Sequence, residues 1–305
     1  MALFILKRLG LALLVALAVS AIAFILLRVS GDPAIAIAGE GARDIDIEAA
    51  RIRHGLDQPL LVQYFIWLGQ ILQGNFGQSV FYKTDVLPLI TSKMPITLSL
   101  GLFAIAFALL ISFPLGVLAA VYSNTWIDRL CLSIAVIGQA LPNFFFALIL
   151  VMIFSINLRW LPVSGSASWV NYIMPTIALG YYVTPAFMRL IRAGMIEVLS
   201  SDYIRTARAK GLSSTSVIFK HALRNAVMPV VALTAVQLGY LLGGSVVIET
   251  IFALDGLGFL AYQGIIHKDF PIIQSVVMIL SVVYVLLTLL SDIANAWLNP
   301  RLRGQ

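Results

Sequence analysis

Long apolar runs constrain this chain more than any other feature. Several of them exceed the roughly 20 residues that a helix needs to cross the hydrocarbon layer of a bilayer. The chain has 305 residues, of which 60% are hydrophobic and 11% are charged, whereas soluble domains carry about 25% charged residues. These values argue against a soluble globule and predict an all-α integral membrane protein with several spans.

Six spans are expected from the apolar runs. The first run follows Lys7 and Arg8, as the core of a signal peptide would, but it is too long for such a core and lacks a small-x-small cleavage pattern before Arg28. We therefore interpret it as a retained span. The predicted spans are Leu9–Leu27, Ile96–Val121, Leu130–Ile156, Tyr172–Arg192, Val227–Ile251 and Ile272–Leu298. They divide the chain into a first span (1–28), an outer segment (29–95) and a core membrane domain (96–305).

Basic residues are distributed unevenly around these spans. Twelve fall on one side if the first span starts in the cytoplasm: Lys7, Arg8, Arg129, Arg189, Arg192, Arg205, Arg208, Lys210, Lys220, Arg224, Arg301 and Arg303. The short loops on the other side carry only Arg159 and Lys268. Because cytoplasmic loops are enriched in Lys and Arg, we expect both termini and the basic segment 201–225 to be cytoplasmic.

The outer segment is predicted to be polar and solvated, since residues 29–95 carry seven acidic and five basic residues. Within it, one stretch predicts an amphipathic helix that starts after Asp57 and Pro59: DQPLLVQYFIWLGQIL. Its apolar face would comprise Leu60, Leu61, Tyr64, Phe65, Leu68, Ile71 and Leu72. Such a helix lies on the outer membrane surface or packs against the spans, and the sequence leaves both readings open.

The basic segment 201–225 is the most unusual part of the chain. It holds five of the 20 lysines and arginines between two apolar runs: SDYIRTARAKGLSSTSVIFKHALRN. Gly211 is placed to end a first helix in a left-handed conformation, and Ser213 or Ser214 is placed to cap a second helix. Small residues such as Ala207 suit insertion of this hairpin into a groove of a partner. A DNA-reading role is disfavoured because membrane spans tether both ends, and binding of anionic lipid explains the charge but not the two-helix layout.

The basic segment and the residues that follow it resemble those of a known family. DYIRTARAKGL…HALRNAVMPV is similar to the cytoplasmic coupling loop, or EAA motif, of ABC-importer permeases in the dipeptide/oligopeptide/nickel subfamily. Gly211 matches the glycine of that motif and Ala207 its second alanine. Arg205 and Arg224 stand where the general motif has Glu and Pro, and both departures are usual in the peptide subfamily. The likeness extends over nearly the whole chain, including GGSVVIETIFALDGLGFLAYQGI and the ending NPRLR, and the B-type subunit is most similar.

The resemblance implies a type I ABC-importer permease fold with a cytoplasmic coupling hairpin at about 194–226, in the bacterial cytoplasmic (inner) membrane. It implies a pathway shared with a second homologous permease, two ABC ATPase subunits that bind ATP and Mg, and an extracytoplasmic solute-binding protein. The residues expected to couple to the ATPase are Tyr203, Arg205, Ala207, Arg208, Lys210, Gly211, Leu212, His221 and Arg224. Di- or oligopeptides are the expected substrate, with glutathione, nickel chelates and some sugars left open.

No catalytic residue or cofactor is expected in the chain itself. It lacks a G-x-x-x-x-G-K-[ST] phosphate loop, so a non-catalytic subunit is predicted. The three histidines are too scattered to suggest a metal site, and the single cysteine rules out an internal disulfide. The main alternative is a secondary, ion-coupled transporter, which would keep ionisable groups at mid-membrane and show internal repeats; neither is evident here.

A few residues within the spans are candidates for an outer gate or a receptor contact. Charges inside spans are costly and therefore mark functional candidates; Glu249 lies near the outer end of the fifth span and Asp292 near the inner end of the sixth. Either could instead reach an interface or pair with a neighbour. Gly243 and Gly244 permit close helix packing or belong to a moving gate. Prolines predict kinks in or beside the spans at Pro114, Pro142, Pro175, Pro185 and Pro229.

Overall fold

Helices make up the regular structure of the chain. The computed structural model describes residues 2–39 and 41–298, and these ranges contain no strand beyond one bridge between Gln78 and Asp85. Helices suit a bilayer because they satisfy their backbone hydrogen bonds internally. The α-helices are α1 (Ala2–Ser30), α2 (Pro33–Ala38), α3 (Asp44–Arg53), α4 (Leu60–Leu72), α5 (Val86–Val121), α6 (Trp126–Ala140), α7 (Asn143–Leu150), α8 (Ile173–Leu199), α9 (Asp202–Ala209), α10 (Leu223–Ala226), α11 (Met228–Ile251), α12 (Leu257–Ile266) and α13 (Phe270–Leu298). Two π-helical segments (Val151–Asn157 and Ser216–Ala222) and a 3-10 turn (Trp169–Tyr172) accompany them.

Four helical stretches are long and apolar enough to cross a membrane. They are Leu6–Leu26 in α1, Val86–Val121, Met228–Ile251 and Phe270–Ala294 in α13, which correspond to the first, second, fifth and sixth predicted spans. The fourth predicted span lies in α8, which is 27 residues long but is not among these four. Its second half carries Arg189, Arg192 and Glu197. The count of six spans therefore stays a prediction.

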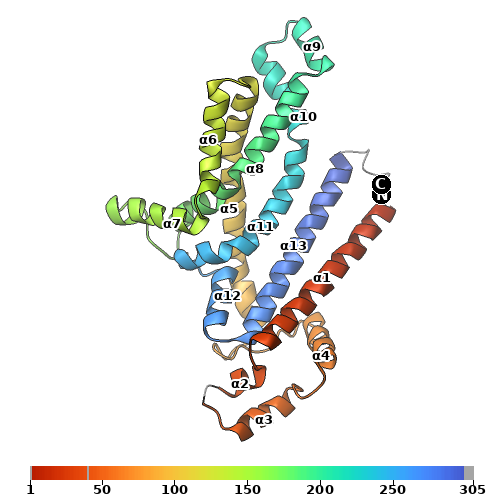
Figure 1. Ribbon diagram of the computed structural model, residues 1–305, viewed down its shortest axis with the longest axis vertical. Coiled ribbons are helices and arrows are strands. Elements are labelled where there is room, and N and C mark those ends of the chain that lie inside the picture. The colour runs from red at the N-terminus through yellow and green to blue at the C-terminus, as the bar shows by residue number, and fades with distance from the viewer. Residues whose placement is uncertain (1, 40, 299–305) are drawn as a thin grey trace.

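The third predicted span, Leu130–Ile156, is not one straight helix. It consists of α6 and of a second helix, Asn143–Asn157, that is bent from it by 97° and projects sideways from the bundle (Figure 1). The break lies at Pro142, because proline has no N–H and disfavours the helical conformation of the residue before it; Leu141 is extended, with φ −107° and ψ 140°. The kink predicted at Pro142 is confirmed, and the two helices together form either one broken span or a re-entrant loop.

Helices α5 and α8 form the centre of the fold. Small residues allow the two backbones to approach, as van der Waals packing between membrane helices requires: a Cβ atom added at Gly180 would lie 2.5 Å from the carbonyl oxygen of Ala104. The Ser112 hydroxyl donates to the Thr184 carbonyl across the interface, at 2.9 Å. Large side chains such as Phe187 are fully buried beside these contacts. The pair therefore forms a buried core on which α6, α7 and α11 pack.

An ion pair attaches α6 to α8. Asp128, in the first turn of α6, is buried, and its two carboxylate oxygens accept hydrogen bonds from Nε and Nη2 of Arg192 at 2.7 and 2.6 Å. The backbone N–H of Asn124 donates to the same carboxylate at 2.9 Å. This forked geometry is the strong form of an arginine–carboxylate contact, so it fixes the end of α8 relative to α6.

Helix α1 lies at the edge of the fold against α13 (Figure 1). Many of its large apolar side chains, including Leu11, Leu13 and Leu14, are exposed in the isolated chain, as expected for a surface that faces lipid. Arg8 of α1 pairs with Asp292 of α13 at 2.9 Å. Asp292 is therefore paired with a neighbour, which was one of the two readings left open by the sequence.

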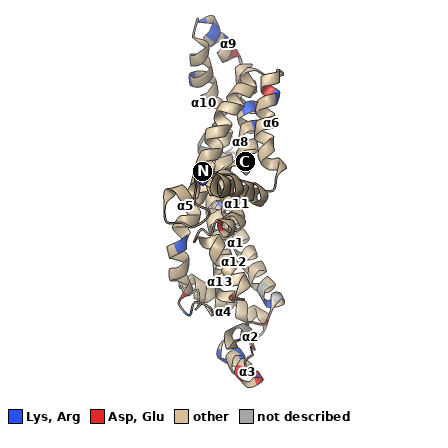
Figure 2. Ribbon diagram, turned by 90° about the vertical axis from the view of Figure 1, so that its left-hand side faces the viewer, with Lys and Arg blue, Asp and Glu red and all other residues tan. Residues whose placement is uncertain are grey.

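The molecule is elongated, and its polar regions lie at its two ends. Helix α9 is at one end and α2 and α3 are at the other, while α1 and α13 lead from the α2–α4 end toward the α9 end (Figure 1). Most charged residues lie toward the two ends (Figure 2). Such a distribution suits a chain whose middle is surrounded by hydrocarbon. The expected basic residues Arg301 and Arg303, and the whole NPRLR ending (299–303), lie outside the described residues.

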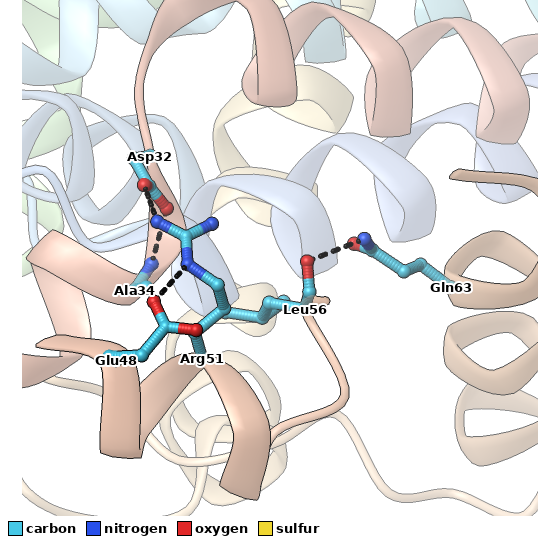
Figure 3. Close-up of polar contacts among 6 residues, drawn as sticks. All are labelled: Asp32, Ala34, Glu48, Arg51, Leu56 and Gln63. Atoms are coloured by element: carbon cyan, nitrogen blue, oxygen red, sulfur yellow. Dashed lines mark hydrogen bonds and ion pairs between the residues drawn. The ribbon is translucent and has the colours of Figure 1, made fainter. Parts of the chain in front are cut away.

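The outer segment folds as three helices joined by polar contacts. Asp32 caps α2 through a bond from the Ala34 N–H at 2.9 Å and pairs with Arg51 of α3 at 2.5 Å, while Arg51 also contacts Glu48 (Figure 3). Burial alone would raise the pKa of Asp32, but the hydrogen bonds from Ala34 and Arg51 outweigh it and hold the pKa of this carboxyl below its usual value. These contacts tie α2 to α3.

The predicted amphipathic helix is present as α4, but its apolar face is divided. Tyr64 packs against Phe24 of α1 with ring centroids 5.6 Å apart, and Trp67 packs against the same ring. The buried residues of α4 are Gln63 and Ile71, whereas Phe65, like Leu60, Leu61 and Leu72, is exposed. One side of α4 therefore packs on the first helix and the other presents apolar side chains outward.

Candidate functional site

The basic segment folds as two short helical arms joined by a turn. We call residues 201–225 the basic hairpin; it lies at the end of the molecule marked by α9 (Figure 1). The first arm is α9 and the second is the π-helical segment Ser216–Ala222 followed by α10. Two arms are expected from the sequence because a run of helix-forming residues precedes Gly211 and another follows the serines after it.

Gly211 makes the turn in the predicted conformation. Its φ is +77°, a left-handed conformation that glycine adopts at no steric cost, and its N–H donates to the Arg208 carbonyl at 2.9 Å. The second arm is capped by Ser213, whose hydroxyl accepts a bond from the Ser216 N–H at 3.3 Å. Both local predictions, the glycine turn and the serine cap, are confirmed.

The inner side of the hairpin is apolar and continuous with the core of the protein. Ile204 is fully buried, and Ala207 is 8% exposed and belongs to the same buried cluster as Val217. At the base of the hairpin, a Cβ atom added at Gly194 of α8 would lie 2.7 Å from the Ala226 carbonyl oxygen. Ala207 therefore packs inside the hairpin, where the sequence suggested a small residue available to a partner.

The outer side of the hairpin presents most of the other candidate residues. His221 is half-buried, and the exposed candidates are Tyr203, Arg205, Arg208, Lys210, Gly211, Leu212 and Arg224. Arg205 contacts Asp202 at 3.2 Å, with both side chains largely exposed. Such a pair contributes at most about 1 kcal/mol, so Arg205 can exchange it for another carboxylate. The hairpin thus combines a rigid inside with a basic outer surface.

Asn225 and Tyr203 connect the two arms. The Asn225 side-chain amide donates to the Tyr203 hydroxyl at 2.8 Å. Tyr203 is among the expected coupling residues only because of its place in the motif, and Asn225 is not among them. A contact between residues 22 positions apart has no local signal, because it depends on how the turn at Gly211 brings the arms together.

Glu249, the candidate for an outer gate, is completely buried and extensively hydrogen-bonded. One carboxylate oxygen accepts bonds from the hydroxyls of Thr97 on α5 and Ser245 on α11, each at 2.8 Å. The other accepts a bond from the Phe259 N–H at 3.0 Å. A carboxylate at the start of α12 also complements the helix dipole. Glu249 therefore joins the ends of α5, α11 and α12.

The glycines before and within α12 make room for this carboxylate. A Cβ atom at Gly256 would lie 2.5 Å from Oε2 of Glu249, and one at Gly258 would lie 2.9 Å from the same oxygen. Thr97 completes the arrangement by accepting a bond from the Leu257 N–H at 2.8 Å. The sequence marks GLGFL only as part of the family resemblance; the nearby buried charge of Glu249 is the signal that could have assigned these glycines this role.

Gly243 and Gly244 lie on an open part of α11. A Cβ atom added at either would meet nothing within 4 Å, so they do not mediate close helix packing within this chain. Close approaches occur instead at other glycines, including Gly138, Gly180 and Gly239. The helix-packing explanation of Gly243 and Gly244 is therefore incorrect for contacts inside the chain.

The titratable residues do not gather into a metal centre in the part of the chain that is described: no group of three or more His, Cys, Asp or Glu side chains is close enough to hold an ion. His54 lies in the outer segment and His221 in the hairpin. His267 stacks on Phe81 with ring centroids 3.6 Å apart. Cys131 is buried on α6.

Membrane-length apolar helices around a packed core define this chain as a multi-pass integral membrane protein. Its family is shown by two matches: residues 112–304 match the family described as "Binding-protein-dependent transport system inner membrane component", and residues 1–101 match the N-terminal membrane component of such systems. The chain belongs to this family of inner-membrane permease subunits of binding-protein-dependent ABC importers.

Curated relatives agree with this assignment. The chain is 42% identical over 273 residues to the glutathione transport system permease protein GsiC of Escherichia coli K12. The aligned region covers 90% of this chain and 89% of that protein. The GsiC protein of Salmonella typhimurium matches with the same identity and coverage. This membership replaces the alternative of a secondary, ion-coupled transporter.

Solved structures share the fold. An inward-facing MetNI methionine ABC transporter contains a chain that aligns with a TM-score of 0.60 and 20% identity, covering 69% of this chain and 96% of that one. An amino acid ABC transporter crystallised with histidines aligns with a TM-score of 0.50 and 17% identity, covering 70% of this chain and 94% of that one.

The family assignment defines the general role of the chain. It is a non-catalytic transport subunit of an ATP-driven importer, and its family implies ATPase and solute-binding-protein partners.

Proposed function

We propose that this chain couples ATP hydrolysis to import through the basic hairpin, and that its substrates are di- or oligopeptides, with glutathione included. The observation that carries the proposal is the build of the hairpin: a buried apolar inside, a glycine turn and an exposed basic outside at one end of the molecule. A rigid projection of this kind suits a groove lined by carboxylates on an ATPase subunit.

In the proposed arrangement the chain has six spans and both termini in the cytoplasm. The spans are α1, α5, the bent pair formed by α6 with Asn143–Asn157, α8, α11 and α13. The asymmetry of basic residues supports this orientation, as does the position of α9 opposite the α2–α4 segment (Figure 1). The hairpin is then cytoplasmic, and the segment 29–95 is extracytoplasmic.

Movement of the hairpin would reach the spans through two direct connections. Helix α8 ends at Leu199, just before α9 begins at Asp202, and α10 ends two residues before α11 begins. The close contact of Gly194 with Ala226 holds α8 against the second arm. Since α8 is also packed on α5 and bonded to α6, a rigid-body displacement of the hairpin would move several helices together.

The outer surface of the hairpin supplies the docking contacts in this proposal. Arg205, Arg208 and Lys210 would pair with acidic groups of the ATPase, Tyr203, Leu212, His221 and Arg224 would add further contacts, and Gly211 would set the turn. Ala207 would contribute from inside by keeping the two arms together. Electrostatic pairing of this kind directs association and orientation more than it adds affinity.

We assign Glu249 a structural part in the outer gate. Its carboxylate holds α12 to α5 and α11, so the outer ends of these helices would move as one unit. The open surface at Gly243 and Gly244 would face a second homologous permease subunit or the pathway between the two. The complete importer would then contain two permeases, two ATPase subunits and one solute-binding protein.

The proposed substrate class rests on the relatives. The GsiC proteins are named as glutathione transport permeases, and glutathione is peptide-like. In binding-protein-dependent systems the receptor makes much of the selection, so peptide uptake is proposed for the complete importer.

A reconstituted importer tests the coupling proposal. The chain is assembled with its partner permease, ATPase subunits and binding protein in proteoliposomes, and peptide uptake and ATP hydrolysis are measured together. The triple variant Arg205→Gln, Arg208→Gln, Lys210→Gln is expected to lose ATPase association, whereas Arg43→Gln and Arg159→Gln, which lie outside the hairpin, are matched charge controls. Normal association and uptake by the triple variant would exclude the proposed docking surface, and uptake by the chain without any ATPase would exclude the function.

A further inference from the structure

A second polar site lies at the opposite end of the molecule from the hairpin. A cavity of about 410 Å³ is enclosed by the end of α1, the α2–α4 segment and the start of α13. Its polar lining consists of Arg28, Arg53, His54, Gln63, Gln70 and Gln274, and no Asp or Glu is present among the described residues that line it. The cavity therefore offers cationic and hydrogen-bond-donating groups without a carboxylate to balance them.

Gln274 is the most informative of these residues. Its side chain is 6% exposed, it lines the cavity, and its amide Nε2 has no hydrogen-bond partner among the residues that the structure describes. A buried donor left unsatisfied costs about 1–3 kcal/mol. Such a group beside a cavity is satisfied by an acceptor that enters the cavity, either a water molecule or a ligand atom.

Arg28 forms no ion pair within the described part of the chain, although it lines a neighbouring cavity together with Asp32. Its Nε donates to Oε1 of Gln63 at 3.2 Å, and its guanidinium lies 4.6 Å from the centre of the Phe24 ring. Gln63 is fixed in turn, because its amide donates to the carbonyls of Leu56 and Gln58 at 3.0 and 2.8 Å. The guanidinium is thus oriented before any ligand arrives.

The nearest acidic residues are already paired. Asp32 and Glu48 both contact Arg51 (Figure 3), and within the described part of the chain neither Arg28 nor Arg53 forms an ion pair with a carboxylate. Arg28 is half-buried, so its charged group loses part of its hydration, and a bound anion would offset that cost. The charge of the cavity therefore favours an anion.

The surroundings of the cavity identify the kind of anion. Tyr64 of α4 contacts the hydroxyl of Ser20 at 2.8 Å, and Ser20 lies inside the membrane-length stretch of α1. Helix α4 therefore packs on the membrane-length stretch of α1, directly beside the cavity. Large apolar side chains are exposed on both helices there, including Ile25 on α1 and Phe65 and Ile66 on α4.

We infer that this cavity binds the headgroup phosphate of an anionic phospholipid from the leaflet on the α2–α4 side. Arg28 and Arg53 would pair with the phosphate, the Gln274 amide would donate to one of its oxygens, and the acyl chains would lie along the exposed faces of α1 and α4. Arginines recognise phosphate through charge-assisted hydrogen bonds, and basic pockets beside membrane helices bind lipid headgroups in this way. The site is independent of the coupling role of the hairpin.

Lipid retention by the assembled importer tests this inference. The complex is purified in detergent, titrated with phosphatidylglycerol or phosphatidylcholine, and analysed by native mass spectrometry and thermal unfolding. We expect preferential retention of phosphatidylglycerol and a rise in the unfolding temperature, since a ligand that binds only the folded state stabilises it. Arg28→Gln or Arg53→Gln should weaken retention about fivefold each, from about 1 kcal/mol per basic residue.

Matched variants and a soluble probe make the test decisive. Gln274→Leu keeps the side-chain volume, removes the buried donor and should also weaken retention, whereas Arg43→Gln alters an exposed arginine of the same segment and should not. If Arg28→Gln fails to assemble, Gln274→Leu and Arg53→Gln decide the question. Equal retention of the two lipids, or unchanged retention in those variants, would overturn the proposal. Binding of glycerol 1-phosphate as tight as that of phosphatidylglycerol would also overturn it, since the site would then serve a soluble anion.

Discussion

The turn at Gly211 gives the sharpest test of how the hairpin works. Its φ is +77°, and a Cβ atom there would meet nothing within 4 Å, so a side chain at this position is opposed by backbone strain and not by crowding. For a residue other than glycine, the left-handed conformation costs about 1–2 kcal/mol. That cost corresponds to a factor of roughly 5–30 in the population of the native turn.

Three substitutions separate strain from side-chain size. Asn tolerates the left-handed conformation better than Ala, and a β-branched residue tolerates it least. We therefore expect the apparent affinity for the ATPase subunits, and the peptide taken up per ATP hydrolysed, to fall in the order Gly, Gly211→Asn, Gly211→Ala and Gly211→Val. The buried contacts of Ile204 and Ala207 should keep the rest of the hairpin folded, so insertion of the chain into the membrane should be unchanged.

The assay measures ATPase retention on the purified permease and the uptake-to-hydrolysis ratio in proteoliposomes. Gly69→Ala is the matched control, because Gly69 also has open space at its Cβ position but lies in α4 without a positive φ. Parental uptake by Gly211→Val would refute the strain argument. Equal losses in the Asn, Ala and Val variants would show that any side chain interferes and that the backbone conformation is not the cause.

Further expectations concern the polar contacts that hold the helices together. Glu249→Gln places an amide donor or a weaker acceptor against the backbone N–H of α12, so the free energy of unfolding should fall by about 1–3 kcal/mol. Thermal unfolding measures this, with the exposed-residue variant Glu197→Gln as the control. An equal melting temperature in the two variants would contradict the expectation. Asp128→Asn removes the charged partner of Arg192 on α8, so the free energy of unfolding should fall by about 2 kcal/mol. Hydrogen exchange at the start of α6 should become faster, and an exchange rate equal to that of the parent protein would exclude a structural role for the pair. Asp32 has a pKa below its usual value in the folded chain, so its stabilising effect is present above the unfolded-state pKa of about 3.9 and is lost as the pH falls through the folded value. The hydrogen-exchange protection factors of α2 and α3, which correct for the pH dependence of intrinsic exchange, should therefore fall below about pH 4, and Asp32→Asn, which stays neutral, should show no such fall.

Turns, caps and helix breaks could be predicted from the local sequence, because they depend on neighbouring residues. The conformation of Gly211, the serine cap at Ser213, the helix after Pro59 and the break at Pro142 each follow from the steric and hydrogen-bonding properties of one or two residues, and all four are confirmed. Six spans were predicted from the length and composition of apolar runs, and four of them correspond to membrane-length helices in the structure. These features need no knowledge of what lies across the fold.

The sequence alone could not place residues that meet across the fold. Asp128 and Arg192 are 64 positions apart, and Thr97 and Glu249 are 152 positions apart; no local pattern brings either pair together. The sequence also could not decide whether Ala207 lies on the surface or in the interior, because a small residue fits either place until its neighbours are known.

The sequence by itself determined where the chain can span a bilayer, because lipid admits only a backbone whose polar groups are hydrogen-bonded. It also determined where the backbone turns or breaks, because glycine adopts dihedral angles that other residues avoid and proline restricts them. What only the tertiary structure decided was the interior position of Ala207 and the pairing of buried polar groups, such as the hydrogen bonds by which Glu249 holds three helices together. The physical reason is that a buried polar side chain is stabilised by whichever group the packed helices bring within about 3 Å of it, and that group is fixed by the fold and not by the adjacent sequence.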